Sequence, residues 1–204
     1  MKLLLATRNP GKTIELKQGL QPLIKQSYII KTLAELKIKE EVEETGTTFK
    51  ENAILKAKYY ADLTGWSTLG DDGGFVIKAL KGEPGVKSRR WLGYEANDEE
   101  LIEYTLKRLK DIPFNKRQAY LEVVLCFFDP ISKKVIYETE KINGYVAEKP
   151  IKKRVRGFPY RSLLIVKPFN KYYDELSKKE HQQVNHRLKA LKRIVDRVKT
   201  IEKT

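Results

Sequence analysis

Residues Trp66 to Phe75 read Trp-Ser-Thr-Leu-Gly-Asp-Asp-Gly-Gly-Phe, and they join two β-prone runs through a pair of adjacent acids, Asp71 and Asp72. The first run ends at Leu69, and the second extends from Phe75 to Leu80. Adjacent acids repel one another and cannot both be buried without a counter-charge, which a bound cation supplies. The pattern predicts a metal-carboxylate corner in which the two glycines turn the chain and let a ligand approach the backbone. The alternative is an ordinary Asp-Gly turn between two strands.

The composition indicates one globular domain over residues 1–204. Hydrophobic residues make up 41% of the chain and charged residues 33%, and 204 residues suit one domain, or two lobes that share one core. No apolar run approaches the length of about 18 residues that a membrane-spanning helix needs. The apolar part of the N-terminus, Leu3 to Ala6, is too short for a signal peptide. The single cysteine, Cys126, excludes an internal disulfide, and a reducing cytoplasm fits it.

The chain is strongly basic, with 41 Lys and Arg against 27 Asp and Glu and a net charge of +14. Such a balance favours polyanionic partners, namely nucleotides, nucleic acid or an anionic membrane surface. The basic residues are spread along the sequence, so a nucleic-acid partner is possible but not favoured. The alternative is a lysine-rich, solvated surface.

The N-terminal segment predicts an anion-binding loop. Residues 2–6 form a predicted buried strand, and Asn9 is a good helix N-cap followed by Pro10 at the first helical position. The predicted helix extends to about residue 23, with an inward face made of Ile14, Leu20, Leu23 and Ile24. A helix N-terminus after a strand directs backbone N–H groups at anions, and Lys12 adds a mobile cation. The alternative is an ordinary loop with a good cap.

Later segments predict an α/β fold with a mixed sheet. Thr48 with Glu51 forms a capping box that starts a helix ending near Gly65, and Lys56 on it is a candidate phosphate ligand. Further predicted elements are strands at 27–33, 118–128, 134–142, 145–147 and 162–166, a hairpin turn at Asn143-Gly144, and helices from Asn97 and Ser177. Strands alternate with helices in the first half, and an antiparallel ribbon fills the second.

Residues 149–161 interleave cations with aromatic side chains around Phe158 and Tyr160. That mixture suits a base stacked on a ring next to phosphates, and the alternative is a basic surface loop. His186 lies off the apolar stripe of the last helix, Val184, Leu188, Leu191, Val195 and Val198, so by default it is an exposed polar residue.

Several motifs in this order resemble the inosine/xanthosine triphosphate pyrophosphatases, the house-cleaning hydrolases of deaminated purine nucleotides. The resemblance spans nearly the whole chain. It rests on Thr7-x-Asn9-x-x-Lys12, the segment from Glu43 to Ala57, Asp71-Asp72-Gly73-Gly74, Pro84-Gly85, Gly157-Phe158 and the segment from His186 to Leu191. The resemblance implies an elongated, two-lobed α/β fold with a central mixed sheet flanked by helices, an active-site cleft between the lobes, and a homodimer.

The resemblance also implies a reaction and its residues. Thr7, Asn9 and Lys12 would bind the triphosphate, and Lys56 would balance its charge. Glu44 and Asp72 would hold Mg²⁺, and Asp72 would also accept the proton of the attacking water. Phe158 would stack on the base, and Tyr160 would close that loop. His186 and Arg187 would contact the base and its sugar-phosphate. The implied reaction is hydrolysis between the α- and β-phosphates to a nucleoside monophosphate and pyrophosphate.

Four positions depart from the family pattern. Gly73 replaces a serine, His181 replaces a lysine, and Pro159 and Arg161 replace the glycine and the aspartate of a Phe-Gly-Tyr-Asp loop. Arginine has five donors and no acceptor, so Arg161 can donate to base carbonyls but cannot accept from a base N–H. We therefore expect altered or relaxed base selectivity. Two alternatives remain: a nucleotide- or RNA-binding protein of this fold with weak or no turnover, and a pyrophosphatase for another modified nucleotide.

Overall fold

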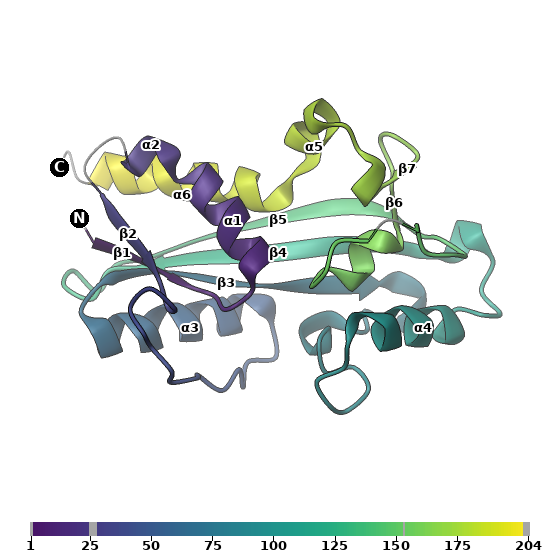
Figure 1. Cartoon of the computed structure of the whole chain (residues 1–204), viewed down its shortest axis with the longest axis horizontal. Helices are drawn as coiled ribbons and strands as arrows, with labels where there is room; N and C mark the ends of the chain where they lie inside the picture. The colour runs from purple at the N-terminus through teal and green to yellow at the C-terminus, as the bar shows by residue number, and fades with distance from the viewer. Residues whose placement is uncertain (1, 25–27, 153, 202–204) are drawn as a thin grey trace. The chain divides into compact units, whose positions relative to one another are not determined.

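The computed structural model describes residues 2–24, 28–152 and 154–201 (Figure 1). Within them, seven strands form one mixed sheet in the order β2-β1-β3-β4-β5-β6-β7. The pairs β1–β2 and β1–β3 are parallel, and β5–β6 and β6–β7 are antiparallel. The strands are β1 (Lys2–Ala6), β2 (Ile29–Thr32), β3 (Ser67–Ile77), β4 (Gln118–Phe128), β5 (Val135–Val146), β6 (Leu164–Val166) and β7 (Lys171–Tyr172). The predicted α/β fold with a mixed sheet is confirmed.

The chain folds into two compact units. Unit 1 comprises Met1–Asp72, Val123–Glu140 and His186–Thr204, and unit 2 comprises Gly73–Glu122 and Lys141–Asn185. Strands β3, β4 and β5 each contribute residues to both units. The cleft predicted between two lobes stays a prediction. No helix in the described ranges is long and apolar enough to cross a membrane.

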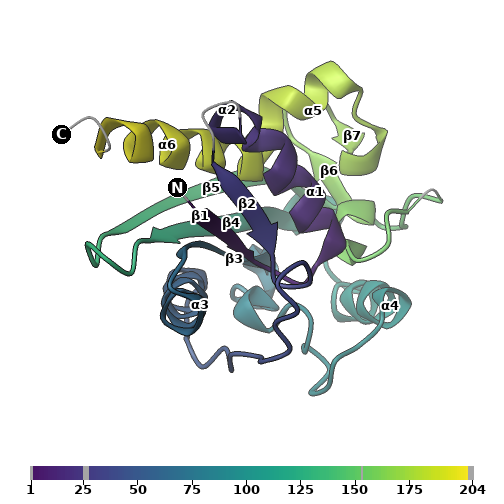
Figure 2. The same cartoon turned by 60° about the vertical axis from the view of Figure 1, so that its left-hand side comes forward.

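Unit 1 has a core on each face of its strands, because successive side chains of a strand point to opposite faces. Leu3 and Leu5 of β1 join the core beneath α1 (Pro10–Gly19), α2 (Gln21–Ile24) and α6 (His186–Ile201). Leu4 of β1 joins a second cluster with Tyr60 of α3 (Phe49–Thr64). Figures 1 and 2 show α1, α2 and α6 on one side of these strands and α3 on the other.

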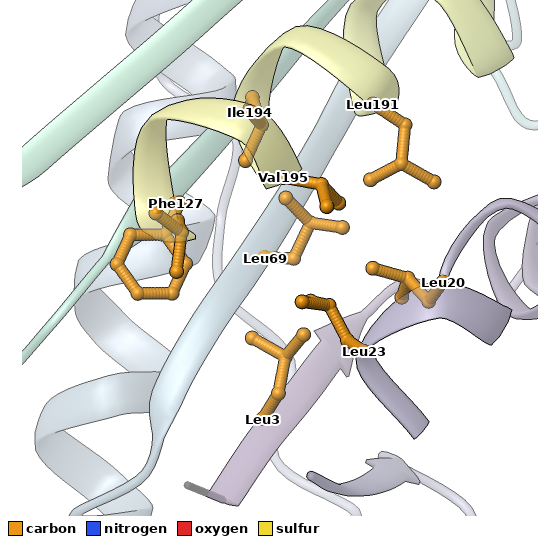
Figure 3. A pocket seen from close by; sticks show the side chains of 9 residues that line it. Leu3, Leu20, Leu23, Leu69, Phe127, Leu191, Ile194 and Val195 are labelled. Carbon is orange, nitrogen blue, oxygen red and sulfur yellow. The ribbon is translucent and has the colours of Figure 1, made fainter. Parts of the chain in front are cut away.

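The first of these cores contains a small apolar cavity of about 10 Å³ (Figure 3). Its lining is entirely hydrophobic and comes from β1, β3, β4, the C-cap of α1, and the helices α2 and α6. The lining residues are Leu3, Leu20, Leu23, Leu69, Phe127, Leu191, Ile194, Val195 and Val198. This volume is at the lower limit for one water molecule, and an apolar wall offers water no hydrogen bonds. The cavity is therefore a packing defect rather than a ligand site.

Helix α3 has both of its predicted ends. The Thr48 and Glu51 side chains form the reciprocal capping box, and the left-handed Gly65 ends the helix. The helix lies against β3 at Gly70, where a Cβ atom would come 2.3 Å from the carbonyl oxygen of Ala53. Only glycine permits this approach. It brings the helix surface that carries Lys56 to the middle of β3, at Asp71 and Asp72.

Unit 2 packs α4 (Asp98–Arg108) and a 3₁₀ turn, Pro159–Ser162, around β3 and β5 residues. The predicted capping box of Asn97 with Glu100 starts α4. A second predicted box, Ser177 with Glu180, starts α5 (Lys178–Val184). Both confirm predictions made from local sequence.

Two predicted turns are wrong. The chain does not turn at Gly73 and Gly74, because β3 continues from Ser67 to Ile77. Nor does it turn at Asn143-Gly144, because β5 continues to Val146. At Gly144 a Cβ atom would come 2.1 Å from the carbonyl oxygen of Ile165, so glycine there allows close approach to β6 rather than a hairpin.

Three burial predictions are also wrong. Ile14 and Ile24 were expected inward, but they are 68% and 41% exposed, and Leu16 takes the buried position on α1. His186 was expected at the surface by default, but it is buried. The predicted last helix is two helices, α5 and α6, with Asn185 between them as the C-cap of α5. The apolar stripe therefore divides between two units.

Candidate active site

Asp71 is a buried carboxylate with two cationic partners in unit 1. Its Oδ1 forms an ion pair with Lys12 Nζ at 2.7 Å, and its Oδ2 accepts a hydrogen bond from Arg187 Nε at 2.6 Å. Arg187 Nη1 in turn donates to Glu15 Oε2 at 2.6 Å. Burial alone would raise the pKa of Asp71, but Arg187 and Lys12 outweigh it and hold the pKa below its usual range. Asp71 therefore links β3 to the starts of α1 and α6.

The N-terminus of α1 confirms the predicted cap. The Asn9 side chain accepts a hydrogen bond from the Lys12 backbone N–H at 3.1 Å. Thr7 Oγ1 accepts from the Asn9 N–H at 3.2 Å, so Thr7 orders the loop before the helix. The expectation of a mobile cation is wrong, since the Lys12 ammonium is paired with Asp71.

Asp72 lies in a different environment from its neighbour. Its Oδ1 accepts a hydrogen bond from Lys56 Nζ at 3.1 Å, and the same ammonium lies 3.2 Å from Glu44 Oε2. The other oxygen, Asp72 Oδ2, is buried and has no hydrogen-bond partner in the described ranges. Burial raises the pKa of Asp72 above its usual value despite the nearby ammonium. Burial also lowers the pKa of Lys56, but Asp72, Glu44 and Asp71 outweigh that effect and leave it raised.

Asp72 and Glu44 are the carboxylates that could hold a metal ion in this part of unit 1. No cluster of three or more His, Cys, Asp or Glu side chains with metal-binding geometry occurs among residues 2–24, 28–152 and 154–201. Mg²⁺ typically takes one or two carboxylates and fills its shell with water and substrate phosphate. Asp72 and Glu44 fit such a site. Asp72 has a buried oxygen without a hydrogen-bond partner in the described ranges, and Glu44 is part-exposed and lies beside the same Lys56 ammonium as Asp72.

In unit 2, Phe158 and Arg161 contact each other directly. The Arg161 guanidinium carbon lies 3.6 Å from the Phe158 ring centroid and 4.8 Å from that of Tyr173. Arg161 is 7% exposed, whereas Phe158 is half-buried. The sequence singled out Phe158 and Arg161 but missed Tyr173, which lies in a short stretch without a recognisable motif.

Tyr160 and His181 also belong to unit 2. The Tyr160 ring stacks on Phe75 with centroids 5.0 Å apart, and its hydroxyl donates to the Ser88 carbonyl oxygen at 2.6 Å. Tyr160 therefore fixes its own loop to Phe75 of β3 and to the Ser88 backbone. His181 packs edge-on against Tyr173 at a centroid distance of 4.5 Å. Gly73 is the first residue of unit 2 on β3, directly after Asp72.

The predicted site residues are thus divided between the two units. Unit 1 contains Thr7, Asn9, Lys12, Glu44, Lys56, Asp72, His186 and Arg187, which the sequence assigned to phosphate, metal or substrate. Unit 2 contains Gly73, Phe158, Tyr160, Arg161 and His181. Glu15 was missed by sequence reasoning, because its role depends on the distant Arg187, and an acidic residue in a helix carries no signal by itself.

A sequence model of the Ham1 family matches residues 3–197. The chain belongs to the Ham1 family. The dITP/XTP pyrophosphatase of Bacillus subtilis is 39% identical over 191 residues, which cover 94% of this chain and 93% of that protein. A dITP/XTP pyrophosphatase of Thermus thermophilus is 39% identical over 199 residues, or 98% of this chain and 92% of that protein.

Solved structures agree with this membership of the Ham1 family. The Staphylococcus aureus Ham1 protein has a TM-score of 0.83 at 30% identity, and the match covers 98% of this chain and 99% of that one. A Coxiella burnetii HAM1 protein has a TM-score of 0.83 at 28% identity, covering 98% of both chains. The family resemblance inferred from the motifs is confirmed.

Proposed function

We propose that this protein is a Mg²⁺-dependent nucleoside triphosphate pyrophosphatase. It hydrolyses non-canonical purine nucleotides such as ITP, XTP and dITP to a nucleoside monophosphate and pyrophosphate. Family membership and near full-length relatives with this activity support the reaction class. We place the reaction at Asp72 because the two adjacent acids differ. Both oxygens of Asp71 are ion-paired, whereas Asp72 has a buried oxygen without a hydrogen-bond partner in the described ranges.

The cations of unit 1 receive the triphosphate. The N-terminus of α1, which includes Lys12, attracts the phosphate groups, because a helix start carries partial positive charge. Lys56 lies beside Asp72 and balances the negative charge of both carboxylate and phosphate. In the reaction, water attacks the α-phosphorus, the bond to the bridging oxygen of the β-phosphate breaks, and pyrophosphate leaves with that oxygen.

Asp72 is the proton acceptor in this proposal. A general base works best when its pKa is close to the working pH, and burial raises the pKa of Asp72 in that direction. Asp72 and Glu44 would hold Mg²⁺, which when bound neutralises the leaving group's charge. Phe158 stacks on the base. The departures at Gly73, Pro159, Arg161 and His181 alter or relax the choice of base.

The test is pyrophosphate release with Mg²⁺ from ITP, XTP, GTP, ATP and dUTP. The Asp72→Asn variant should lose at least about 10²-fold in kcat, the usual contribution of a positioned base. Asp62→Asn, an exposed residue of α3, is the matched control and should retain activity. Equal turnover by Asp72→Asn would remove Asp72 from the mechanism. Tight nucleotide binding without release from any triphosphate would favour a binding protein of the same fold.

We also propose a homodimer in the cytoplasm, which follows from the family resemblance. Light scattering coupled to size-exclusion chromatography tests the assembly. A mass of one chain, 23.7 kDa, across the working concentration range would contradict it.

A further inference from the structure

One face of α3 contacts the segment that precedes this helix, and both belong to unit 1. The face consists of Asn52, Lys56 and Tyr60, which are four residues apart and therefore point to the same side of the helix. All three side chains are buried. Residues 38–46 form neither helix nor strand, so no helix or sheet ladder fixes their backbone. The contacts with α3 therefore decide where this segment lies (Figure 1).

The first contact fixes the backbone two residues after Glu44. Asn52 Oδ1 accepts a hydrogen bond from the Gly46 backbone N–H at 2.8 Å. A Cβ atom on Gly46 would come 2.5 Å from that oxygen and 2.7 Å from Glu51 Cβ, so a larger residue would push the loop away. The buried amide of Asn52 thus holds the loop at a distance that suits glycine.

The second contact fixes the backbone four residues before Glu44. The Tyr60 hydroxyl donates to the Glu40 carbonyl oxygen at 2.9 Å, although its ring lies in the core beside Leu4. Arg8, in the loop between β1 and α1, donates to the same oxygen at 2.9 Å. The Glu40 carbonyl is therefore held from two directions.

The third contact lies between these two anchors. Lys56 Nζ is 3.2 Å from Glu44 Oε2 and 3.1 Å from Asp72 Oδ1, so one ammonium bridges the two carboxylates. The Glu44 side chain is 40% exposed, and an ion pair at such exposure contributes little order by itself. The backbone anchors on either side thus do most to keep Glu44 beside Asp72.

Building on the proposed metal site, we infer that Asn52 and Tyr60 are positioning residues for Glu44. They hold the segment antiparallel to α3, so that positions 46, 44 and 40 face Asn52, Lys56 and Tyr60 in turn. Both carboxylates then stay available to one divalent cation. A site that is formed only part of the time binds its ligand more weakly in proportion, and the two anchors avoid that loss.

The test is the binding of Mn²⁺ alone to the whole chain, with free Mn²⁺ measured by electron paramagnetic resonance. Asn52→Leu keeps the size of the side chain but removes the acceptor. It should raise the Kd about tenfold, as is usual when a residue that orients a metal ligand is lost. Tyr60→Phe removes only a hydroxyl and should raise the Kd about threefold, because Arg8 still holds the same carbonyl. Tyr59→Phe, at the exposed neighbouring position, is the control and should leave the Kd unchanged.

Two further measurements separate positioning from damage to the fold. At saturation, Asn52→Leu and Tyr60→Phe should bind as many ions per chain as the wild type, and fewer ions would contradict a positioning role. Glu44→Gln should weaken binding more than either variant. If it binds Mn²⁺ as the wild type does, the ion lies elsewhere and the inference is wrong. Gly46→Ala replaces Asn52→Leu if circular dichroism shows that the latter does not fold, and the same rise in Kd is expected.

An unchanged Kd in both Asn52→Leu and Tyr60→Phe would overturn the inference, as would a wild type that binds no Mn²⁺. Pyrophosphate release with Mg²⁺ is measured separately and tests the proposed function. If the wild type releases none from any triphosphate, the proposed function fails, while weaker Mn²⁺ binding in the two variants still supports the inference. Release by a wild type whose Mn²⁺ affinity neither variant changes rejects the inference alone.

Discussion

Asp71 and Asp72 follow one another in the chain, yet their carboxylates have separate partners. Adjacent residues of a strand point to opposite faces. Asp71 therefore faces Lys12 and Arg187, while Asp72 faces Lys56 and Glu44. The first acid holds the scaffold together, and the second remains available for chemistry. The sequence singled out the acid pair, and the structure shows that the partners of Asp71 are the cations of Lys12 and Arg187.

The two acids should differ in their effect on stability. Asp71→Asn leaves the buried Arg187 without its main counter-charge, so we expect a loss of about 3–5 kcal/mol in the free energy of unfolding. Asp72→Asn leaves Glu44 beside Lys56, and the loss should be about 1 kcal/mol or less. Urea denaturation of both variants measures the difference. Equal losses would contradict the division between a structural and a chemical acid.

Asp174 should make stability depend on pH. Its pKa is about 6 in the folded protein against 3.8 for the ordinary group, so the folded state binds the proton more tightly. The unfavourable burial of the charge is therefore absent below about pH 4, grows between about pH 4 and 6, and is complete above that window. Asp174→Asn should raise the free energy of unfolding by about 1 kcal/mol at pH 7.5, since a half-buried group is partly screened, and should change little at pH 4.

Thermal melts at both pH values check this expectation. Asp196→Asn, at an exposed position of α6, is the control and should behave alike at pH 4 and 7.5. A gain from Asp174→Asn of the same size at both pH values would show that the effect does not come from ionisation.

Among the elements, the helix starts followed from local sequence, and the strand turns did not. The capping boxes of α3, α4 and α5 lie where they were predicted. A cap needs only two side chains three residues apart, so neighbouring residues specify it. By contrast, Asp72-Gly73-Gly74 and Asn143-Gly144 lie inside the continuous strands β3 and β5. Pairing with other strands overrides the turn preference of these residues.

The start of α4 provides a test at this scale. The Asn97 side chain accepts from the Glu100 N–H, and the Glu100 side chain accepts from the Asn97 N–H. Asn97→Ala removes half of this box and should cost about 1 kcal/mol of stability. Glu103→Ala, an exposed position in the middle of the same helix, should change stability by less than about 0.5 kcal/mol. Denaturant melts of the two variants compare them, and equal values would show that the cap contributes nothing.

At the scale of the whole molecule, the core of unit 1 contains an apolar cavity of about 10 Å³. Val195 of α6 lines it, and Figure 3 shows this side chain beside Leu69. Val195→Ile adds one methylene to an apolar space and should raise the free energy of unfolding by about 0.5–1 kcal/mol. Val135→Ile makes the same change at an exposed position of β5 and should have no effect. A loss of stability in Val195→Ile would show that the cavity cannot accept the group without strain.

The sequence by itself determined the fold class, the helix caps and most of the residues that the candidate site contains. These depend on hydrophobic period, on capping pairs and on motifs that lie within short stretches. Only the tertiary structure decided which charged side chains form ion pairs with one another. Arg187 is 116 residues from Asp71, and Glu15 is 172 residues from Arg187. No local rule brings such partners together, because their contact depends on how α1 and α6 pack on the strands. The same packing buried His186 and paired Lys12 with Asp71.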